Sequence, residues 1–231
     1  MTSARGEPSD SVQRSAGKLL AIAHRAGNSL AALRAAVEAG VDVIEADVHH
    51  HRGALEVRHH KTMGPLPLLW DTWELMPASR PRLGLTELVR AAAAGATFML
   101  DLKGRGTDVG VEVASLLHVE APERPVIVCS REWPVLDAFA GVDWIRVVRS
   151  ARKPAELAAL RAHVPRSGGY GVSVHQSLLS ADLVAELREH VEVVMTWPVN
   201  DLRTLDRVVS AGATGIISDE PAILREVHAR A

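Results

Sequence analysis

Hydrophobic and polar positions along this chain follow two alternating spacings. Short apolar runs, typical of buried strands, are each followed by a longer segment in which apolar residues recur every three or four positions, as on one face of a helix. The strands are predicted at 19–24, 43–48, 97–103, 126–130, 144–149, 171–175, 191–196 and 215–218. The helices are predicted at 30–38, 86–94, 109–118, 135–140, 154–163, 181–190, 201–210 and 221–228.

This alternation of strands and helices predicts a parallel sheet, because successive strands are joined by right-handed helical crossovers. Eight such units in about 200 residues predict an α/β fold, a closed (β/α)8 TIM barrel in a single domain. An open doubly wound sheet is the alternative, but a Gly-x-Gly-x-x-Gly turn does not follow the first strand. Residues 1–17 are polar and predict a disordered tail, so the barrel domain is expected to cover 18–231.

One region after the second barrel strand departs from the repeat. Gly53 marks a turn, and a short strand at 55–59 is expected to close a hairpin with the strand before it. The segment 61–85 is rich in proline and contains Gly64 and Gly84. These residues predict an irregular excursion from the barrel.

The composition of the 231 residues narrows the classes of function. The net charge is −2 with 23% charged residues, so a basic surface that would attract nucleic acid is not expected. Cys129 is the single cysteine, which excludes an intramolecular disulfide and is typical of a reducing compartment. The sequence has neither an apolar run long enough to span a bilayer nor a secretory signal at its start. We therefore expect a soluble, cytoplasmic protein whose oligomeric state the sequence leaves open.

Polar and charged residues gather at the carboxyl ends of the predicted strands. In a TIM barrel these ends form the face where active sites lie. Glu45 and Asp47 are two positions apart on an apolar strand, so their side chains share a face and repel each other unless a cation lies between them. The other candidates at strand ends are His24, Arg25, His59, Asp101, Lys103, Ser130, Arg149, His175, Trp197, Asn200, Ser218 and Asp219.

Several of these candidates together have the chemistry that phosphodiester cleavage requires. A metal site with only oxygen ligands suits Mg²⁺ or Ca²⁺ better than Zn²⁺. Such a cation, with Arg25 and Lys103, would neutralise a phosphate group during displacement. Two histidines on either side of the phosphate would act as base and acid near neutral pH.

Six short motifs resemble the glycerophosphodiester phosphodiesterase family, in the order found in that family and across the whole predicted barrel. Together they extend from the first predicted strand to the start of the last predicted helix. The motifs are Ala23-His24-Arg25, residues 40–48 (Gly-Val-Asp-Val-Ile-Glu-Ala-Asp-Val), Val57-Arg58-His59, Leu100-Asp101-Leu102-Lys103, residues 196–200 (Thr-Trp-Pro-Val-Asn) and residues 212–221 (Gly-Ala-Thr-Gly-Ile-Ile-Ser-Asp-Glu-Pro).

The resemblance implies a phosphoric diester hydrolase that depends on one divalent cation and acts in lipid or glycerol metabolism. It implies that Glu45, Asp47 and Asp101 hold the metal, which would be Mg²⁺ or Ca²⁺. It also implies that His24 and His59 form the acid/base pair. Which histidine is the acid, and whether water or a substrate hydroxyl is the nucleophile, stays open.

The same resemblance, together with the strand-end positions, suggests residues that would contact the substrate. Arg25 and Lys103 would contact the phosphate, and Trp197 would line the pocket, as in the family. Arg149 and His175 lie at strand ends where substrate contact is expected, although structural roles are an equal alternative.

The sequence also departs from the family pattern at three places. The loop after Arg25 is shorter than usual, and Asp101 stands where most members have Glu. The sphingomyelinase D-like phospholipases, relatives on the same barrel, share both features. His60 follows His59 where the family usually has Asp, which leaves either histidine as the second catalytic one, with the spacing from Gly53 favouring His59.

Three functions are therefore compatible with the sequence. The first is hydrolysis of a glycerophosphodiester, a small-molecule substrate, to an alcohol and glycerol 3-phosphate. The second is a lysophospholipase D or sphingomyelinase D-type activity on a lysolipid substrate, with Trp70 and Trp73 as a lip for the acyl chain. The third is a barrel without catalytic activity that binds a phosphorylated ligand.

Overall fold

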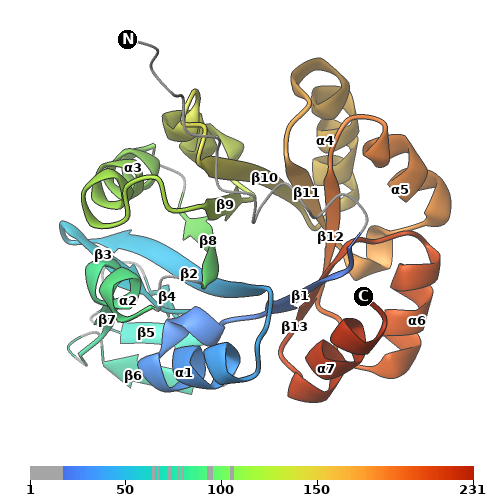
Figure 1. The fold of residues 1–231 in the computed structure, drawn as a ribbon. Coiled ribbons are helices and arrows are strands. Elements are labelled where there is room, and N and C mark those ends of the chain that lie inside the picture. Colours follow the sequence, from blue (N-terminus) through green and yellow to red (C-terminus); the bar gives the residue numbers. More distant parts are fainter. Residues whose placement is uncertain are drawn as a thin grey trace, which may run out of the picture.

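Eight parallel strands close into a barrel in this protein, as seen in a computed structural model that describes residues 18–231 apart from 64, 65, 67, 72, 73, 78, 80, 93–95, 105 and 106. The order around the barrel is β1, β2, β8, β9, β10, β11, β12 and β13, and β13 pairs again with β1 (Figure 1). The barrel strands are β1 (Leu20–Ala23), β2 (Val43–His51), β8 (Thr97–Lys103), β9 (Val126–Ser130), β10 (Ile145–Ala151), β11 (Gly171–His175), β12 (Val193–Trp197) and β13 (Gly215–Ser218). The predicted TIM barrel is confirmed. The predicted tail at residues 1–17 lies outside the described residues.

Helices form an outer layer around the strands (Figure 1). The α-helices are α1 (Leu30–Glu38), α2 (Leu85–Ala91), α3 (Asp108–Glu120), α4 (Pro154–Ser167), α5 (Ala181–Arg188), α6 (Leu202–Ser210) and α7 (Pro221–Ala229). The helix predicted at 135–140 is instead a 3₁₀ segment, η3 (Trp133–Phe139), and two shorter 3₁₀ turns are η2 (Ala26–Asn28) and η4 (Gln176–Leu178). The first helix begins where the sequence predicts, because the Ser29 side chain accepts a hydrogen bond of 3.1 Å from the Ala32 amide.

Two apolar clusters lie on the two faces of the barrel strands. The smaller cluster takes alternate residues from the strands, among them Ile22, Met99 and Met195, and fills the barrel interior. The larger cluster takes the intervening strand residues, such as Ile44, and packs them against the helices, for example against Leu33 of α1. A residue's place in the alternation therefore decides whether it faces the inside of the barrel or the helical layer.

The expectation of an irregular segment at 61–85 is wrong. Three strands, β4 (Lys61–Thr62), β5 (Leu68–Asp71) and β6 (Glu74–Pro77), form a separate antiparallel sheet. A further strand, β7 (Leu83–Gly84), pairs with β3 (Ala54–Val57), the second strand of the predicted hairpin. Strands of two to four residues are too short to show an alternating pattern, and Pro77 ends its strand, where a missing N–H group is tolerated.

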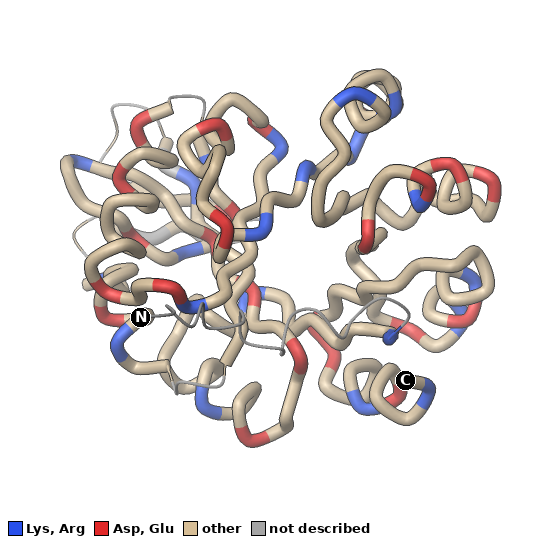
Figure 2. The backbone as a smooth tube through the Cα atoms, turned by 45° about the horizontal axis from the view of Figure 1, so that its top comes forward, with Lys and Arg blue, Asp and Glu red and all other residues tan. Residues whose placement is uncertain are grey.

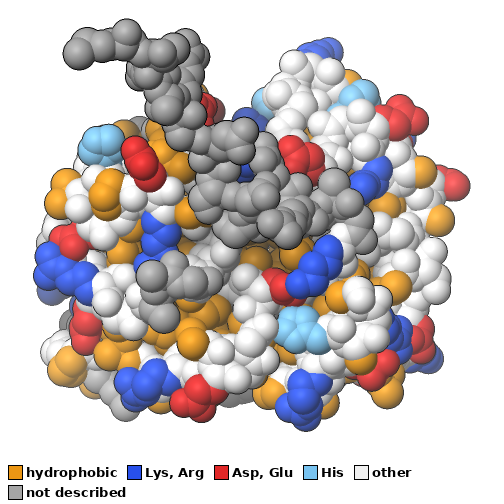
Figure 3. All heavy atoms as spheres, viewed as in Figure 1, with side chains coloured by type: hydrophobic (Ala, Val, Ile, Leu, Met, Phe, Trp, Pro, Cys, Tyr) orange, Lys and Arg blue, Asp and Glu red, His pale blue; other side chains and the backbone are white. Residues whose placement is uncertain are grey.

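Charged side chains of both signs are distributed over the outer helices. Figure 2 shows Lys and Arg next to Asp and Glu along the same segments, and Figure 3 shows charged and hydrophobic side chains mixed on the face that it presents. Ion pairs join neighbouring helices, as between Arg161 of α4 and Glu186 of α5 at 2.6 Å. None of the helices in the described part of the chain combines the length and the apolar character needed to cross a membrane.

Candidate functional site

Three carboxylates meet at the carboxyl end of two neighbouring strands. Glu45 and Asp47 come from β2, and Asp101 of β8 is the register partner of Asp47. One oxygen from each of the three side chains lies within 4.8 Å of the others. Glu45 and Asp47 are 2% and 1% exposed, so this group lies inside the mouth of the barrel. The structure thus brings together the three residues that the sequence suggested as metal ligands.

The charges in this cluster are poorly balanced. Burial and the nearby charge of Asp47 raise the pKa of Glu45 well above its ordinary value. Burial also raises the pKa of Asp101, although the ammonium group of Lys103 opposes this rise. Lys103 lies 2.8 Å from Asp47 and forms a second ion pair with Asp101. Although burial alone would lower it, the three carboxylates raise the pKa of Lys103, so this side chain is a stable cation.

The segment between β1 and α1 is hydrogen-bonded to the same carboxylates. The backbone amide of Arg25, which adopts a left-handed φ of 56°, donates to Glu45 Oε2 at 2.6 Å. Asn28 donates from Nδ2 to Asp47 Oδ2 at 2.8 Å and accepts the Asp47 amide at 2.9 Å. Gly27 allows this close approach, because a Cβ atom there would lie 2.6 Å from the Cβ of Ala46. Sequence analysis did not assign this role to Asn28.

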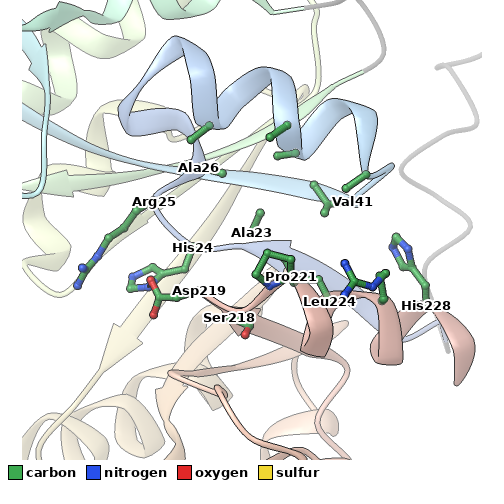
Figure 4. Close-up of a pocket in the computed structure, with 15 residues that line it drawn as sticks. Ala23, His24, Arg25, Ala26, Val41, Ser218, Asp219, Pro221, Leu224 and His228 are labelled. Atoms are coloured by element: carbon green, nitrogen blue, oxygen red, sulfur yellow. The ribbon is translucent and has the colours of Figure 1, made fainter.

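His24 at the end of β1 is held by a carboxylate from the opposite end of the chain. Its Nδ1 lies 2.9 Å from Asp219 Oδ1, directly after β13, and Figure 4 shows the two side chains facing each other. Asn200 donates to the second oxygen of Asp219 at 3.0 Å and accepts the Asp219 amide at 3.0 Å. Burial alone would raise the pKa of Asp219, but the contacts with His24 and Asn200 lower it to about 2. Asp219 is therefore ionised at neutral pH and orients the imidazole of His24.

His59 has the same arrangement with a different partner. Its Nδ1 lies 2.8 Å from Asp71 Oδ2 on β5, so the small sheet supplies the residue that orients this histidine. Burial alone would raise the pKa of Asp47, but Lys103 lowers it and His59 adds to this lowering, so the His59 ring lies near the acidic cluster. Sequence analysis missed Asp71 because the segment around it was expected to be irregular. The contact supports His59 as the histidine of the site. The neighbouring His60 accepts a hydrogen bond from Arg58 through its backbone carbonyl.

Two aromatic rings form another part of the barrel mouth. His175 and Trp197 are register partners at the ends of β11 and β12, and their rings meet edge to face with centroids 5.1 Å apart. The guanidinium of Arg152 lies over the Trp197 ring at 5.9 Å. Both predicted residues therefore lie at the face of the barrel that carries the acidic cluster.

Arg149 is a predicted substrate-binding residue whose side chain the structure does not bring to this face. Its neighbour Val148 belongs to the interior cluster, so the side chain of Arg149 points outward, toward the helical layer. Its charge acts on Asp137 of η3 and His163 of α4. The strand was predicted to end at Arg149 but continues to Ala151. Its alternation directs the guanidinium away from the mouth, and we leave Arg149 out of the proposed site.

The chain resembles solved structures of phosphodiesterases over almost its whole length. No protein-family model and no curated protein matches the sequence. A candidate glycerophosphoryl diester phosphodiesterase from Silicibacter pomeroyi is 18% identical, with a TM-score of 0.75 over 98% of this chain and 95% of that one. An Oleispira antarctica phosphodiesterase in complex with its product sn-glycerol-3-phosphate is 18% identical, with a TM-score of 0.72 over 90% of this chain and 96% of that one.

A third solved structure extends the same likeness. A glycerophosphodiester phosphodiesterase from Thermotoga maritima is 16% identical, with a TM-score of 0.71 over 90% of this chain and 98% of that one. Each of these three proteins is covered almost completely, so the likeness extends over the whole domain rather than a shared fragment. The chain therefore has the fold of the glycerophosphodiester phosphodiesterases.

Proposed function

We propose that this protein is a metal-dependent phosphodiesterase that hydrolyses glycerophosphodiesters to an alcohol and glycerol 3-phosphate. The observation that carries the proposal is the arrangement of two carboxylate-bound histidines, His24 and His59, around the three clustered carboxylates. The fold and the product bound to the Oleispira antarctica phosphodiesterase support the same chemistry.

A divalent cation fits the carboxylate cluster on grounds of charge and ligand type. Three carboxylates share the space with the ammonium group of Lys103, and burial together with the neighbouring carboxylate charges raises the pKa values of Glu45 and Asp101. Glu45, Asp47 and Asp101 would hold Mg²⁺ or Ca²⁺, because both ions prefer oxygen ligands. When bound, the cation supplies positive charge that stabilises the charge building up on the phosphate.

The two histidines supply the proton transfers. In each ring the aspartate occupies Nδ1, which leaves Nε2 as the atom that exchanges a proton with the substrate. One histidine takes the proton of the nucleophile, which is water or a hydroxyl group of the substrate. The other gives a proton to the leaving alcohol as its bond to phosphorus breaks. Asp219 and Asp71 stabilise the charged form of each imidazole and keep its orientation.

Two cationic side chains would bind the phosphate. Arg25 follows His24 directly, and its backbone amide donates a hydrogen bond to Glu45. This contact fixes the backbone of Arg25 beside the cluster, and the guanidinium extends from there. Lys103 forms ion pairs with Asp47 and Asp101 in the same cluster. Trp197, whose ring meets that of His175 edge to face, would form the apolar wall for the organic part of the substrate.

The first prediction concerns substrate and metal. Glycerophosphocholine should be hydrolysed in the presence of Mg²⁺ or Ca²⁺, and EDTA should abolish the reaction, since the carboxylate cluster is proposed to need a cation. Release of choline and of glycerol 3-phosphate would be measured by coupled assays. Metal binding without turnover of this diester would contradict the proposed reaction and favour a barrel that only binds a phosphorylated ligand.

The second prediction concerns the acid/base pair. His24→Ala and His59→Ala should each lower kcat by about 100-fold or more, because each removes one proton-transfer group. His118→Ala on the exposed side of α3 is the matched control and should retain full activity. Circular dichroism would verify that all three variants are folded. Normal turnover by either active-site variant would exclude that histidine from the reaction.

The third prediction concerns Asp219 as a positioning residue. Asp219→Asn keeps the size of the side chain but removes the charge that faces His24, so kcat should fall at least about tenfold while KM changes little. The pH dependence of kcat should change shape as well, which a merely structural loss would not produce. An unchanged profile with unchanged kcat would show that Asp219 does not act through His24.

The fourth prediction concerns the metal ligands. Glu45→Gln should weaken the binding of Mg²⁺ and Ca²⁺ at least about tenfold, measured by isothermal titration calorimetry, because one anionic ligand is lost. Glu38→Gln, the same change at an exposed position of α1, is the control and should bind as the wild type does. If the two variants bound metal equally well, Glu45 would not be a ligand.

A further inference from the structure

The side chain of Arg152 lies over the ring of Trp197 at the mouth of the barrel. Its guanidinium is 5.9 Å from the centre of that ring. Trp197 ends β12 and packs against the apolar cluster that fills the barrel interior, so the ring lies above that interior. Arg152 follows β10 directly, and β11 lies between β10 and β12 (Figure 1). The side chain of Arg152 therefore extends across the end of β11 to reach the tryptophan.

The alternation along β10 explains why this arginine reaches the mouth while Arg149 does not. Val148 belongs to the interior cluster, and Ala151 belongs to the cluster that packs against the helices. Because neighbouring residues of a strand point to opposite faces, Arg152 takes the inward direction after Ala151. The strand therefore does supply an arginine to the mouth, three positions after the one that the sequence suggested.

Arg152 and Trp197 lie across the mouth from the acidic cluster. In the closed ring of eight strands, β11 is four places from β2, and β12 is four places from β8. Glu45 comes from β2 and Asp101 from β8, so the cluster and the tryptophan are on opposite sides of the mouth. A phosphodiester carries two organic groups. With its phosphate at the cluster, one of these groups would extend across the mouth toward Trp197.

The positive charge of Arg152 is not matched by a neighbouring carboxylate. Within the described part of the chain, no ion pair involves its guanidinium. Glu156 accepts the backbone amide of Arg152 at 2.7 Å, but both of its oxygens are bound by the guanidinium of Arg131. The negative charge of Glu156 is therefore already neutralised, and the guanidinium of Arg152 can bind a ligand.

His175 adds a hydrogen-bond donor beside this cation without adding charge. Its Nδ1 accepts a hydrogen bond of 3.3 Å from the Ser177 amide, which leaves the ring proton on Nε2. Burial lowers the pKa of His175, and the charge of Arg152 lowers it further. The imidazole is therefore uncharged at neutral pH, and Arg152 supplies positive charge next to it.

A cation on an aromatic ring affects which organic groups can lie against that ring. A quaternary ammonium such as choline binds the open face of an aromatic side chain. Arg152 occupies a face of Trp197 and would repel a second positive charge. A carboxylate or phosphate would instead gain a charge-assisted hydrogen bond from the guanidinium, while the carbon atoms next to it contact the ring.

We propose that Arg152 and Trp197 form a subsite for an alcohol group that carries an oxyanion of its own. This inference rests on the proposed function, because it names the class of alcohol that the same reaction releases. The overall reaction is unchanged: the oxygen of water bonds to phosphorus, the bond from phosphorus to the alcohol oxygen breaks, and the alcohol takes up a proton. The products are glycerol 3-phosphate and an anionic alcohol.

The first measurement compares three diesters of glycerol 3-phosphate that differ in one terminal group. Their alcohols are ethanolamine, propanol and 3-hydroxypropionate, which share a two-carbon unit and end in ammonium, methyl and carboxylate. With Mg²⁺ at low ionic strength, kcat/KM should be at least about tenfold higher for the carboxylate ester than for the ammonium ester. Added salt should reduce this difference, because it screens exposed charges. Equal values for all three esters would overturn the subsite and leave the proposed function intact.

The second measurement removes the charge. The ratio of kcat/KM for the carboxylate ester to that for the ammonium ester should fall about tenfold in Arg152→Gln. It should stay within about twofold of the wild-type ratio in Arg166→Gln, the same change at an exposed position in the last turn of α4. Arg152→Lys keeps the charge and should retain most of the preference. Thermal unfolding would verify that the variants fold.

The ratio separates recognition of charge from packing. If Arg152 only packed against Trp197, its loss would change the hydrolysis of all three esters alike, and the ratio would not move. An unchanged ratio in Arg152→Gln would therefore overturn the proposal, whatever the activity of that variant.

A binding assay distinguishes failure of this inference from failure of the proposed function. If none of the esters were hydrolysed, isothermal titration calorimetry would measure their binding in the presence of Mg²⁺. Tighter binding of the carboxylate ester by the wild type, lost in Arg152→Gln, would support the subsite although the proposed function had failed. Equal binding of the carboxylate and ammonium esters by the wild type would overturn the subsite as well.

Discussion

The crowding of three carboxylates, two of them buried, at the mouth of the barrel is the constraint on which the rest of the site depends. Glu45, Asp47 and Asp101 repel one another in a place with little water, so each needs compensation from its surroundings. Lys103 provides one cation, and the backbone amide of Arg25 and the side chain of Asn28 provide hydrogen bonds. These contacts hold the loop after β1 against β2, so the crowded carboxylates also fix the backbone around them.

The two histidines join distant parts of the chain at this cluster. His24 and Asp219 bring together the first and the last barrel strands, which are neighbours only because the barrel closes. His59 and Asp71 link the hairpin after β2 to the small sheet of β4, β5 and β6. That sheet is therefore part of the candidate site, since it supplies the carboxylate that orients one imidazole. A change in the excursion would act on the proposed chemistry through Asp71.

The same closure of the barrel leaves a groove beside His24. In most of the helical layer large apolar side chains fill the space between helices and strands, as Leu33 does beneath α1. The alanines on the flank of α1 leave space toward α7 instead. This open apolar space lies next to His24 at the end of β1.

By itself the sequence determined the features that depend on local spacing. Apolar runs and helical periodicity identified the eight barrel strands, and the alternation along β2 placed Glu45 and Asp47 on one face. The rule that active sites lie at the carboxyl ends of the strands then selected His24 and Asp101. Each of these features can be predicted from the spacing of a few neighbouring residues and from the closure of the barrel.

Tertiary structure decided the features that depend on residues far apart in the chain. Asp219 lies 195 positions from His24, and no local pattern could pair them. The strands of the excursion were too short to show a period, so Asp71 was not recognised as the partner of His59. The groove exists because the alanine face of α1 meets α7, at the other end of the sequence. Contacts of this kind arise only when the chain folds, because folding determines which distant side chains share a space.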